Sequence, residues 1–219
     1  MVADGRWSEL RGGARIVPRV LGPGRLTLLR SQAGPLAGDY DRVEIRIESG
    51  TLSIEPVAAT VALPGSARTV LELDVTVGDG ARLVLEDAPL VVAEGADVVR
   101  TTTIRLGVGA VAIVRDLVVL GRAGEGPGRL ESVLRADGPD GVILHDALRV
   151  EPATWDADVY VALAPGHRAV GMVAVLGEGA SGEGGAGDAG GGRLAGGGWL
   201  WRASAVSAAD VVAQLERVR

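Results

Sequence analysis

The 219-residue sequence contains no cysteine, no lysine and no phenylalanine. Without cysteine there is no disulfide, no thiolate metal ligand and no thiol nucleophile. Without lysine there is no Walker P-loop, whose lysine binds nucleotide phosphates, and no Schiff-base chemistry. Aromatic residues make up only 3% of the chain, so the core must be built from Val, Leu, Ile and Ala. Several classes of enzyme are therefore excluded before any motif is considered.

Charge and hydropathy argue against two kinds of partner. The net charge is −6, and the arginines are scattered rather than gathered in a basic stripe with aromatic residues. A nucleic-acid partner is therefore not expected. No uncharged apolar run approaches the roughly 20 residues that span a bilayer, and the N-terminus lacks the apolar segment of a signal peptide. We expect a cytoplasmic protein without a membrane partner.

Strand patterns fill most of the chain. In residues 42–48, Val43, Ile45 and Ile47 alternate strictly with charged residues, as in a strand with one buried face. Residues 69–77 repeat this alternation. Further β-rich runs, separated by Gly and Pro, continue to about residue 163. Short strands at this spacing predict an all-β protein.

Glycines mark a weak internal rhythm. Gly50, Gly80, Gly95 and Gly109 each stand just before an apolar strand pattern. Repeated units of turn and strand are typical of sheets that stack or wind as a solenoid, in a β-helix-like arrangement. Glycines in the ordinary turns of a meandering β protein would give the same pattern. Both interpretations stay open at this point.

The chain is predicted to be a single domain over residues 1–219. More than half of residues 177–198 are glycine, which predicts a flexible loop. A helix is expected at about 207–218, with Ser207 as its N-cap and Asp210 three residues later, as in a capping box. The apolar face of this helix would consist of Val211, Val212, Leu215 and Val218.

Two motifs were tested for ligand chemistry. Residues 107–112 spell G-x-G-x-x-A, but a strand pattern follows where dinucleotide binding requires a helix. The two histidines, His145 and His167, lack the spacing of metal ligands. The neighbours His145 and Asp146 could bind a metal weakly or tune a proton transfer. A strand residue with a local hydrogen bond is the simpler interpretation.

No pattern of residues favours catalysis. The sequence has no G-x-S-x-G element for a nucleophilic serine. Glu86 and Asp87 are neighbours at a strand end, so their side chains should point to opposite faces, which is poor geometry for acid–base work. We therefore expect no enzyme and no tightly bound cofactor.

A series of short elements runs in a distinctive order from Leu29 to Arg219. A Gly-rich turn comes first, followed by the alternating strand, a turn at Gly50 and an Ala-Ala-Thr element. A strand–Pro–strand unit, a Leu-Gly-Arg element, a strand pair containing Asp146 and a closing strand and helix follow. This order resembles the urease accessory protein UreD family, also called UreH. The residues that match family motifs are Gly34, Gly38, Asp39, Ala58, Ala59, Thr60, Gly121 and Arg122.

The resemblance implies a mostly β fold with winding strands and a role in urease maturation. Such a protein is a scaffold or chaperone that binds urease apoprotein. It recruits the accessory protein UreF and, through it, the GTPase UreG, for nickel insertion into the urease active site. A homodimer within the complex is an arrangement that the resemblance allows.

The resemblance also implies an internal path for nickel in transit. Such a path needs weak, exchangeable oxygen ligands, because tight ligands would trap the ion. Asp39 and Asp146 match family positions and are the candidate residues lining it. The alternative for Asp39 is a hydrogen bond within its own turn. The alternative for Asp146 is an exposed acid at a strand end.

A second hypothesis is a non-enzymatic β-solenoid or sandwich binding module unrelated to urease, for instance one that recognises carbohydrate. Such sites usually display aromatic platforms. With four Trp, two Tyr and no Phe, the chain has few residues for one.

Overall fold

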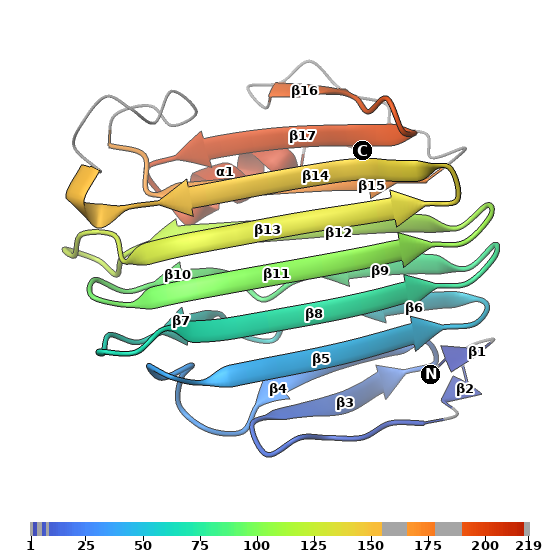
Figure 1. The fold of residues 1–219 in the computed structure, drawn as a ribbon, viewed down its shortest axis with the longest axis horizontal. Helices are drawn as coiled ribbons and strands as arrows, with labels where there is room; N and C mark the ends of the chain where they lie inside the picture. Colours follow the sequence, from blue (N-terminus) through green and yellow to red (C-terminus); the bar gives the residue numbers. More distant parts are fainter. Residues whose placement is uncertain (1, 4–5, 8, 155–165, 178–189, 217–219) are drawn as a thin grey trace.

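The computed structural model describes residues 2–3, 6–7, 9–154, 166–177 and 190–216 (Figure 1). Strands dominate these residues, together with one α-helix, α1 (Ala208–Leu215), and a short 3₁₀ turn, η1 (Pro152–Thr154). No helix in this part of the chain is long and apolar enough to cross a membrane. The prediction of an all-β protein with a C-terminal helix is confirmed.

The strands form two sheets that lie face to face, with sheet A in front and sheet B behind in Figure 1. Sheet A contains, in spatial order, β14 (Gly141–Val150), β13 (Arg129–Gly138), β11 (Asp97–Leu106), β8 (Thr69–Val77), β5 (Tyr40–Ile47), β1 (Val2–Ala3) and β2 (Arg6–Trp7). Sheet B contains β16 (Gly190–Arg193), β17 (Gly198–Ala205), β15 (Ala169–Leu176), β12 (Val111–Leu120), β9 (Arg82–Glu86), β6 (Thr51–Ile54), β4 (Arg25–Arg30) and β3 (Ile16–Gly22), with β10 (Leu90–Val92) and β7 (Thr60–Ala62) beside them.

The chain winds between the two sheets as a solenoid. In each coil, a strand of sheet A is followed by one or two strands of sheet B: β5 by β6 and β7, β8 by β9 and β10, and β11 by β12. Successive coils pair in parallel and in register, so Leu71 of β8 lies between Asp41 of β5 and Arg100 of β11. The predicted winding of the strands is confirmed.

The glycine rhythm reflects these coils. Gly50, Gly80 and Gly109 lie at the turns from sheet A into sheet B, with φ of 75°, 64° and 66°. In this left-handed region glycine is free of the strain that a Cβ causes. Gly95 lies at the opposite end, where the chain returns from β10 to β11. The spacing between equivalent turns is therefore one coil.

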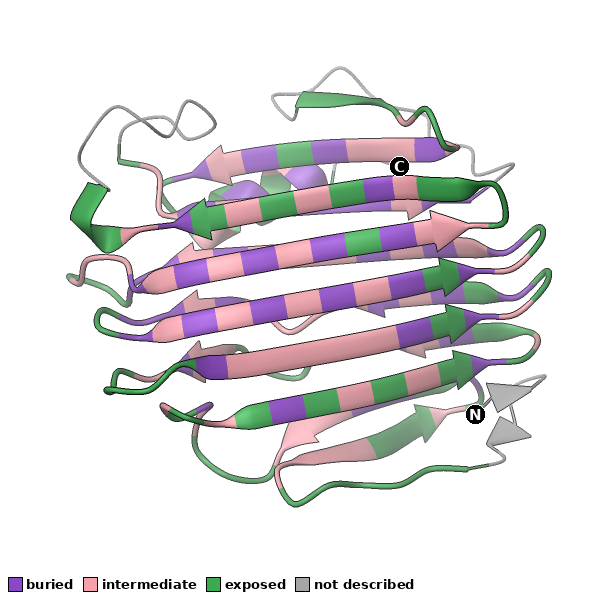
Figure 2. Cartoon of the chain, viewed as in Figure 1, coloured by how far each residue is buried: buried purple, intermediate pink, exposed green. Residues whose placement is uncertain are grey.

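Alternation places the apolar residues between the sheets. Buried and less buried residues alternate along β11 and β13 (Figure 2). Val75, Ile104 and Leu83 are completely buried in one continuous cluster that both sheets share. The predicted inward positions on β5 and β8 are confirmed, and the core is aliphatic, as the lack of aromatic residues requires.

The C-terminal part of sheet B corrects one prediction. Residues 177–198 were expected to form a flexible loop, but Gly190–Arg193 is strand β16, paired antiparallel with β17. A Cβ at Gly191 would lie 2.1 Å from Cδ1 of Trp201, so glycine is needed here because the indole packs on the backbone. Residues 194–197 form the turn that leads to Gly198, the first residue of β17. Residues 178–189 of the predicted loop and the predicted strand at about 158–164 lie outside the described residues.

Helix α1 covers part of the outer face of sheet B. Its N-cap is Ser207, whose Oγ accepts a hydrogen bond from the backbone N–H of Asp210 at 3.2 Å, as predicted. Val211 and Leu215 are buried against β15, where a Cβ on Gly171 would lie 2.6 Å from Val211 Cγ1. The predicted apolar face is wrong at Val212, which is 42% exposed. Val218 lies outside the described residues.

Candidate functional site

The space between the two sheets contains a series of cavities. An upper cavity of about 390 Å³ lies among β11–β15 and β17. A middle cavity of about 130 Å³ follows towards β4 and β5, and a lower cavity of about 340 Å³ lies against residues 9–18. The upper and middle cavities share Asp87, Arg100 and Thr102, and the middle and lower cavities share Asp41 and Val43. We call this series of neighbouring cavities, which share lining residues, the interior passage.

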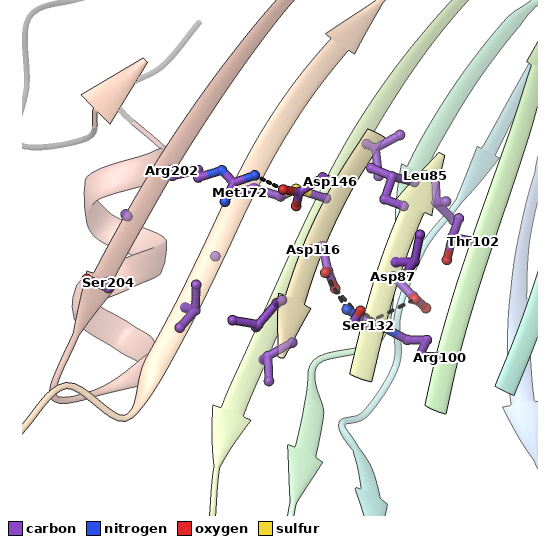
Figure 3. A pocket seen from close by; sticks show the side chains of 18 of the residues that line it. Leu85, Asp87, Arg100, Thr102, Asp116, Ser132, Asp146, Met172, Arg202 and Ser204 are labelled. Carbon is purple, nitrogen blue, oxygen red and sulfur yellow. Dashed lines mark hydrogen bonds and ion pairs between the residues drawn. The ribbon is translucent and has the colours of Figure 1, made fainter. Parts of the chain in front are cut away.

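Three ion pairs cross the interior passage, and each joins one sheet to the other. They are Arg30 of β4 with Asp41 of β5, Arg100 of β11 with Asp116 of β12, and Arg202 of β17 with Asp146 of β14. Figure 3 shows the second and third pairs at the upper cavity. Charges removed from water need partners and hydrogen bonds, because an unpaired buried charge is strongly destabilising.

Arg100 makes the most complete of these pairings. Its Nη1 and Nη2 donate to the two carboxylate oxygens of Asp116 at 2.8 and 2.5 Å, and its Nε donates to Ser132 Oγ at 3.0 Å. This bidentate arrangement is the strongest form of the arginine–carboxylate contact. Arg100 therefore lies, with its side chain hydrogen-bonded to both sheets, among the residues that the upper and middle cavities share.

Asp87 lies near Arg100 but does not form a close ion pair with it. Its Oδ1 accepts a hydrogen bond from the backbone N–H of Ala88 at 2.8 Å, and its Oδ2 lies 3.9 Å from Nη1 of Arg100, which is already bonded to Asp116. Burial raises the pKa of Asp87; the charge of Arg100 opposes this shift and that of Asp116 adds to it. Its side chain is 37% exposed, whereas those of Asp41, Asp116 and Asp146 are 8%, 17% and 15% exposed. Of these four carboxylates, that of Asp87 is therefore the most accessible to a ligand.

Asp39, the first predicted site residue, is engaged in its own turn. Its Oδ2 accepts a hydrogen bond from the backbone N–H of Leu36 at 2.9 Å, directly after Gly38 with φ 86°. Nη1 of Arg15 lies 3.4 Å from Oδ1. Asp39 does not line any of the three cavities, whereas Asp41, two residues later, lines two of them. The structure thus shows the turn contact, and a role in the path stays a prediction.

Asp146, the second predicted site residue, lines the upper cavity. The expectation of an exposed acid at a strand end is wrong, because Asp146 lies in the middle of β14, and its side chain is only 15% exposed and pairs with Arg202. His145 takes the exposed position beside it. The two acids predicted from the sequence therefore lie at opposite ends of the molecule and do not form one site.

The remaining family-motif residues shape turns and strand ends. Gly34 has φ 133°. Ala58 and Ala59 are exposed and lead into β7, where the N–H of Thr60 donates to the carbonyl of Pro89 at 2.8 Å. Thr60 also lines the middle cavity. Thr60 thus links the coil that contains β7 to the coil that contains β10, beside the middle cavity.

Gly121 and Arg122 form the turn after β12. A Cβ on Gly121, which has φ 80°, would lie 2.3 Å from the carbonyl oxygen of Gly126. Arg122 Nε donates to Glu125 Oε1 at 2.7 Å, and this hydrogen bond is the main cause that lowers the pKa of Glu125 to about 2. These contacts fix the turn and place no further group in a cavity.

Sequence reasoning missed Asp41, Asp116 and Arg100. It set Asp87 aside together with Glu86 because their side chains were expected on opposite faces, whereas both residues line the middle cavity. The sequence carried a signal for Asp41, Arg100 and Asp116, because each occupies an inward position of an alternating strand. Asp41, for instance, lies two residues before Val43 and therefore on the same face of β5. Such a position predicts burial but not a partner. Asp87 carries no such signal, since it follows the end of β9.

Two observations concern a metal site and an aromatic platform for carbohydrate. Among the residues that the structure describes, no group of three or more His, Asp or Glu side chains is placed to hold a metal ion. Trp199 and Trp201 stack with ring centroids 5.8 Å apart, but Trp201 is only 4% exposed. The stacked pair therefore does not present two open rings to a carbohydrate.

These features define a two-sheet β-solenoid with an aliphatic core that is crossed by three ion pairs. A family model described as "UreD urease accessory protein" matches residues 18–219. The chain belongs to this family, and the membership supports a role in urease maturation.

Curated relatives named urease accessory protein UreD agree with the family match. The chain is 40% identical to the Streptomyces coelicolor protein over 177 residues, which is 76% of this chain and 68% of the relative. It is 44% identical to the Frankia alni protein over 128 residues, or 57% of this chain and 43% of the relative. It is 37% identical to the Parafrankia sp. protein over 199 residues, or 78% and 67%. The matched part thus spans from less than half to about two thirds of these relatives.

Proposed function

We propose that the chain is a non-enzymatic scaffold of urease maturation whose interior passage carries nickel. It binds urease apoprotein and recruits the accessory protein UreF and, through it, the GTPase UreG. Family membership supports the scaffold role. The observation that carries the transit role is the series of neighbouring cavities, which share lining residues and are lined by Asp41, Asp87, Asp116 and Asp146.

The chemistry of the lining suits transit better than storage. Ni²⁺ binds most tightly to nitrogen and sulfur ligands, whereas carboxylate oxygens hold it weakly. The sequence has no cysteine, and His167, whose Nδ1 lies 2.9 Å from Ser204 Oγ, is the histidine that lines the upper cavity. An ion on this path therefore meets mainly ligands that release it again.

The ion pairs also lower the electrostatic repulsion that the buried arginines would exert on a cation. Each arginine is compensated by a carboxylate, so the interior presents no unbalanced positive charge. Asp87 adds a carboxylate with an available oxygen at the boundary between the upper and middle cavities. A passing ion can bind Asp87 first and compete with Arg100 for Asp116 afterwards.

The energy for delivery comes from a partner in this proposal. The sequence contains no lysine and hence no P-loop, so nucleotide hydrolysis would reside in the GTPase. The scaffold is tested by co-expression with urease subunits, UreF and UreG, followed by affinity pull-down of this chain. Recovery of the complex is expected. Elution of the chain alone, with its partners folded and soluble, would refute the scaffold role.

The transit role is tested by variants that keep the complex intact. Asp87→Asn and Asp146→Asn should lower urease activation at limiting nickel without reducing pull-down, and excess nickel should restore part of the activity. Asp39→Ala tests the first predicted residue in the same assay. The matched control is Asp74→Asn, which changes an acid on the outer face of sheet A. Full activation by both cavity variants would remove the interior passage from the route while leaving the scaffold role untouched.

A further inference from the structure

Sheet B contains a break that sheet A lacks. Strand β12 runs without interruption from Val111 to Leu120, but the neighbouring coil is divided into β9 and β10. Glu86 pairs with Arg115 and Leu90 pairs with Val118, so residues 87–89 bulge out of the ladder. The coil on the other side of β9 and β10, which precedes them in the sequence, is divided at the same place by residues 55–59, between β6 and β7. We call this interruption of two successive coils the break.

Prolines help to maintain the break. Pro89 and Pro56 lie within the two interrupting segments, and neither has a backbone N–H to donate to a ladder. The carbonyl of Pro89 instead accepts from Thr60, which starts the strand of the next coil. The break is therefore encoded locally and stabilised by its neighbours, and it does not close into a regular sheet.

A groove lies on the outer face of sheet B between the break and α1. We call this hollow of about 560 Å³ the side groove. Pro56, Pro89, Leu117 and Val212 are among its apolar walls, and Glu86 lies 3.4 Å from Arg115 within it. It is open to solvent on the side of Val212, which is 42% exposed.

The side groove and the interior passage share lining residues across the break. The side groove shares Asp87, Asp116 and Met172 with the upper cavity. It shares Pro56, Glu86 and Asp87 with the middle cavity. Asp87 is the one described residue that lines all three hollows, and its carboxylate is also the one without an arginine of its own.

We propose that the break is a side opening of the interior passage and that Asp87 is the residue at which a small divalent cation crosses it. The cation would enter or leave between the bulge at residues 87–89 and helix α1. The identity of the cargo as nickel rests on the proposed function, whereas the existence of the opening does not.

The charges around the opening suit a cation. Glu86, Asp116 and Glu216 line the side groove together with Asp87, and Arg115 is the basic residue in the lining. Acidic groups lining a recess raise the local concentration of cations. Pro56, Pro89 and Leu117 add surface that does not bind the ion.

The absence of cysteine permits a direct test on the isolated protein. Thr102 is 8% exposed and lines the upper and middle cavities, so Thr102→Cys reports entry of a small cationic methanethiosulfonate reagent. Leu83→Cys is the closed-core reference, because Leu83 is completely buried and lines none of the hollows named here. Val212→Trp fills the side groove, and Val206→Trp, at an exposed position away from it, is the matched control.

The cysteine of Thr102→Cys is expected to react with the reagent much faster than that of Leu83→Cys. Adding Val212→Trp to Thr102→Cys should lower the reaction rate by roughly an order of magnitude, whereas adding Val206→Trp should leave the rate unchanged. Equal rates for the two reporters would show that the interior is closed and would overturn the proposal. Equal rates with and without Val212→Trp would show that reagent enters elsewhere and would overturn it as well. Thermal melts of each variant identify any rate that reflects unfolding.

A second arm tests the cargo in the assembled complex. With urease subunits, UreF and UreG co-expressed, Val212→Trp should lower nickel-dependent activation and Val206→Trp should not, with equal pull-down for both. If Val212→Trp slows the reagent but leaves activation unchanged, nickel does not use the opening and that part of the proposal is overturned. Failure of the scaffold role is distinguishable, because it appears as loss of pull-down with the unmodified chain.

Discussion

Sheets A and B are made from the same coils, yet they differ in continuity. The central strands of sheet A, β5, β8, β11 and β13, are each eight to ten residues long and pair in register along their length. In sheet B the same coils give β6 with β7 and β9 with β10, which are short and separated by bulges. On the side of β12, β15 and β17, sheet B consists of uninterrupted strands, and there α1 covers its outer face.

This difference separates two tasks. Sheet A holds the register of the coils, and its outer face satisfies its own charges: Arg42 contacts Glu44 and Asp74, and Arg135 contacts Asp137. In sheet B the hydrogen-bonded ladder is interrupted at residues 55–59 and 87–89, and hollows lie beside Asp87 at this interruption. A continuous sheet thus provides the frame, and its interrupted partner provides access.

The largest effect is expected where the two sheets are tied together by charge. Arg100→Leu leaves Asp116 and Asp87 without a counter-charge, which should cost about 3–5 kcal/mol of unfolding free energy in urea at neutral pH. In Arg100→Leu/Asp116→Leu most of the loss should be recovered, because an apolar pair of similar volume often replaces a buried ion pair without cost. A loss below about 1 kcal/mol in the single variant, as for an exposed pair, would mean that water already screens the pair.

A somewhat smaller effect tests whether the interrupted sheet is less well packed. Ile104 of β11 and Leu83 of β9 are completely buried in the same cluster. Ile104→Ala and Leu83→Ala should therefore each cost about 2–5 kcal/mol. The control Val108→Ala, at a 65% exposed position, should change stability by less than about 0.5 kcal/mol. If Leu83→Ala cost far less than Ile104→Ala, the break would loosen the core beneath it and the two sheets would not share one core.

The smallest effect concerns the break itself and depends on pH. Because burial raises the pKa of Asp87, the folded protein holds this proton more tightly than the unfolded chain does. Its contribution to stability is present below the ordinary aspartate pKa of 3.8 and is lost as the pH rises through the folded-state pKa. Asp87→Asn should therefore be more stable than the unchanged protein at pH 7, and the gain should shrink below pH 3.8.

This pH dependence is measured by urea unfolding at both pH values, with Asp74→Asn as the control on the outer face of sheet A. A loss of stability on Asp87→Asn at pH 7 would show that Arg100 stabilises the charged carboxylate more than burial opposes it. In that case Asp87 would be a structural ion-pair member, and the contrast between a framework sheet and an access sheet would be weaker.

Much of the fold could be predicted because its signals are local. Alternation identified the inward residues of β5 and β8, and Ser207 marked the start of α1. The spaced glycines agreed with coils but equally with the turns of a meandering sheet, and only the structure separates the two. The glycines of β16 misled the prediction, because glycine is typical of flexible linkers and the sequence does not show that an indole ring packs on Gly191.

The candidate site was predicted only in part. Asp146 was selected by resemblance and does line a cavity, but the same reasoning chose Asp39, which binds its own turn, over Asp41. A side chain's face follows from a period of two residues, whereas its partner depends on which strands stack opposite one another. Arg100 and Asp116 come from different sheets, and alternation along one strand says nothing about the other.

By itself, the sequence determined the all-β class, the aliphatic core and the absence of thiol and lysine chemistry. The tertiary structure alone decided that three arginine–aspartate pairs bridge the two sheets and that Asp87 lies where three hollows meet. The physical reason is that alternation and turn chemistry act between neighbours in the chain. Asp87 lies at the meeting point of the three hollows because two successive coils are interrupted at the same height, and this coincidence exists only once the coils are stacked.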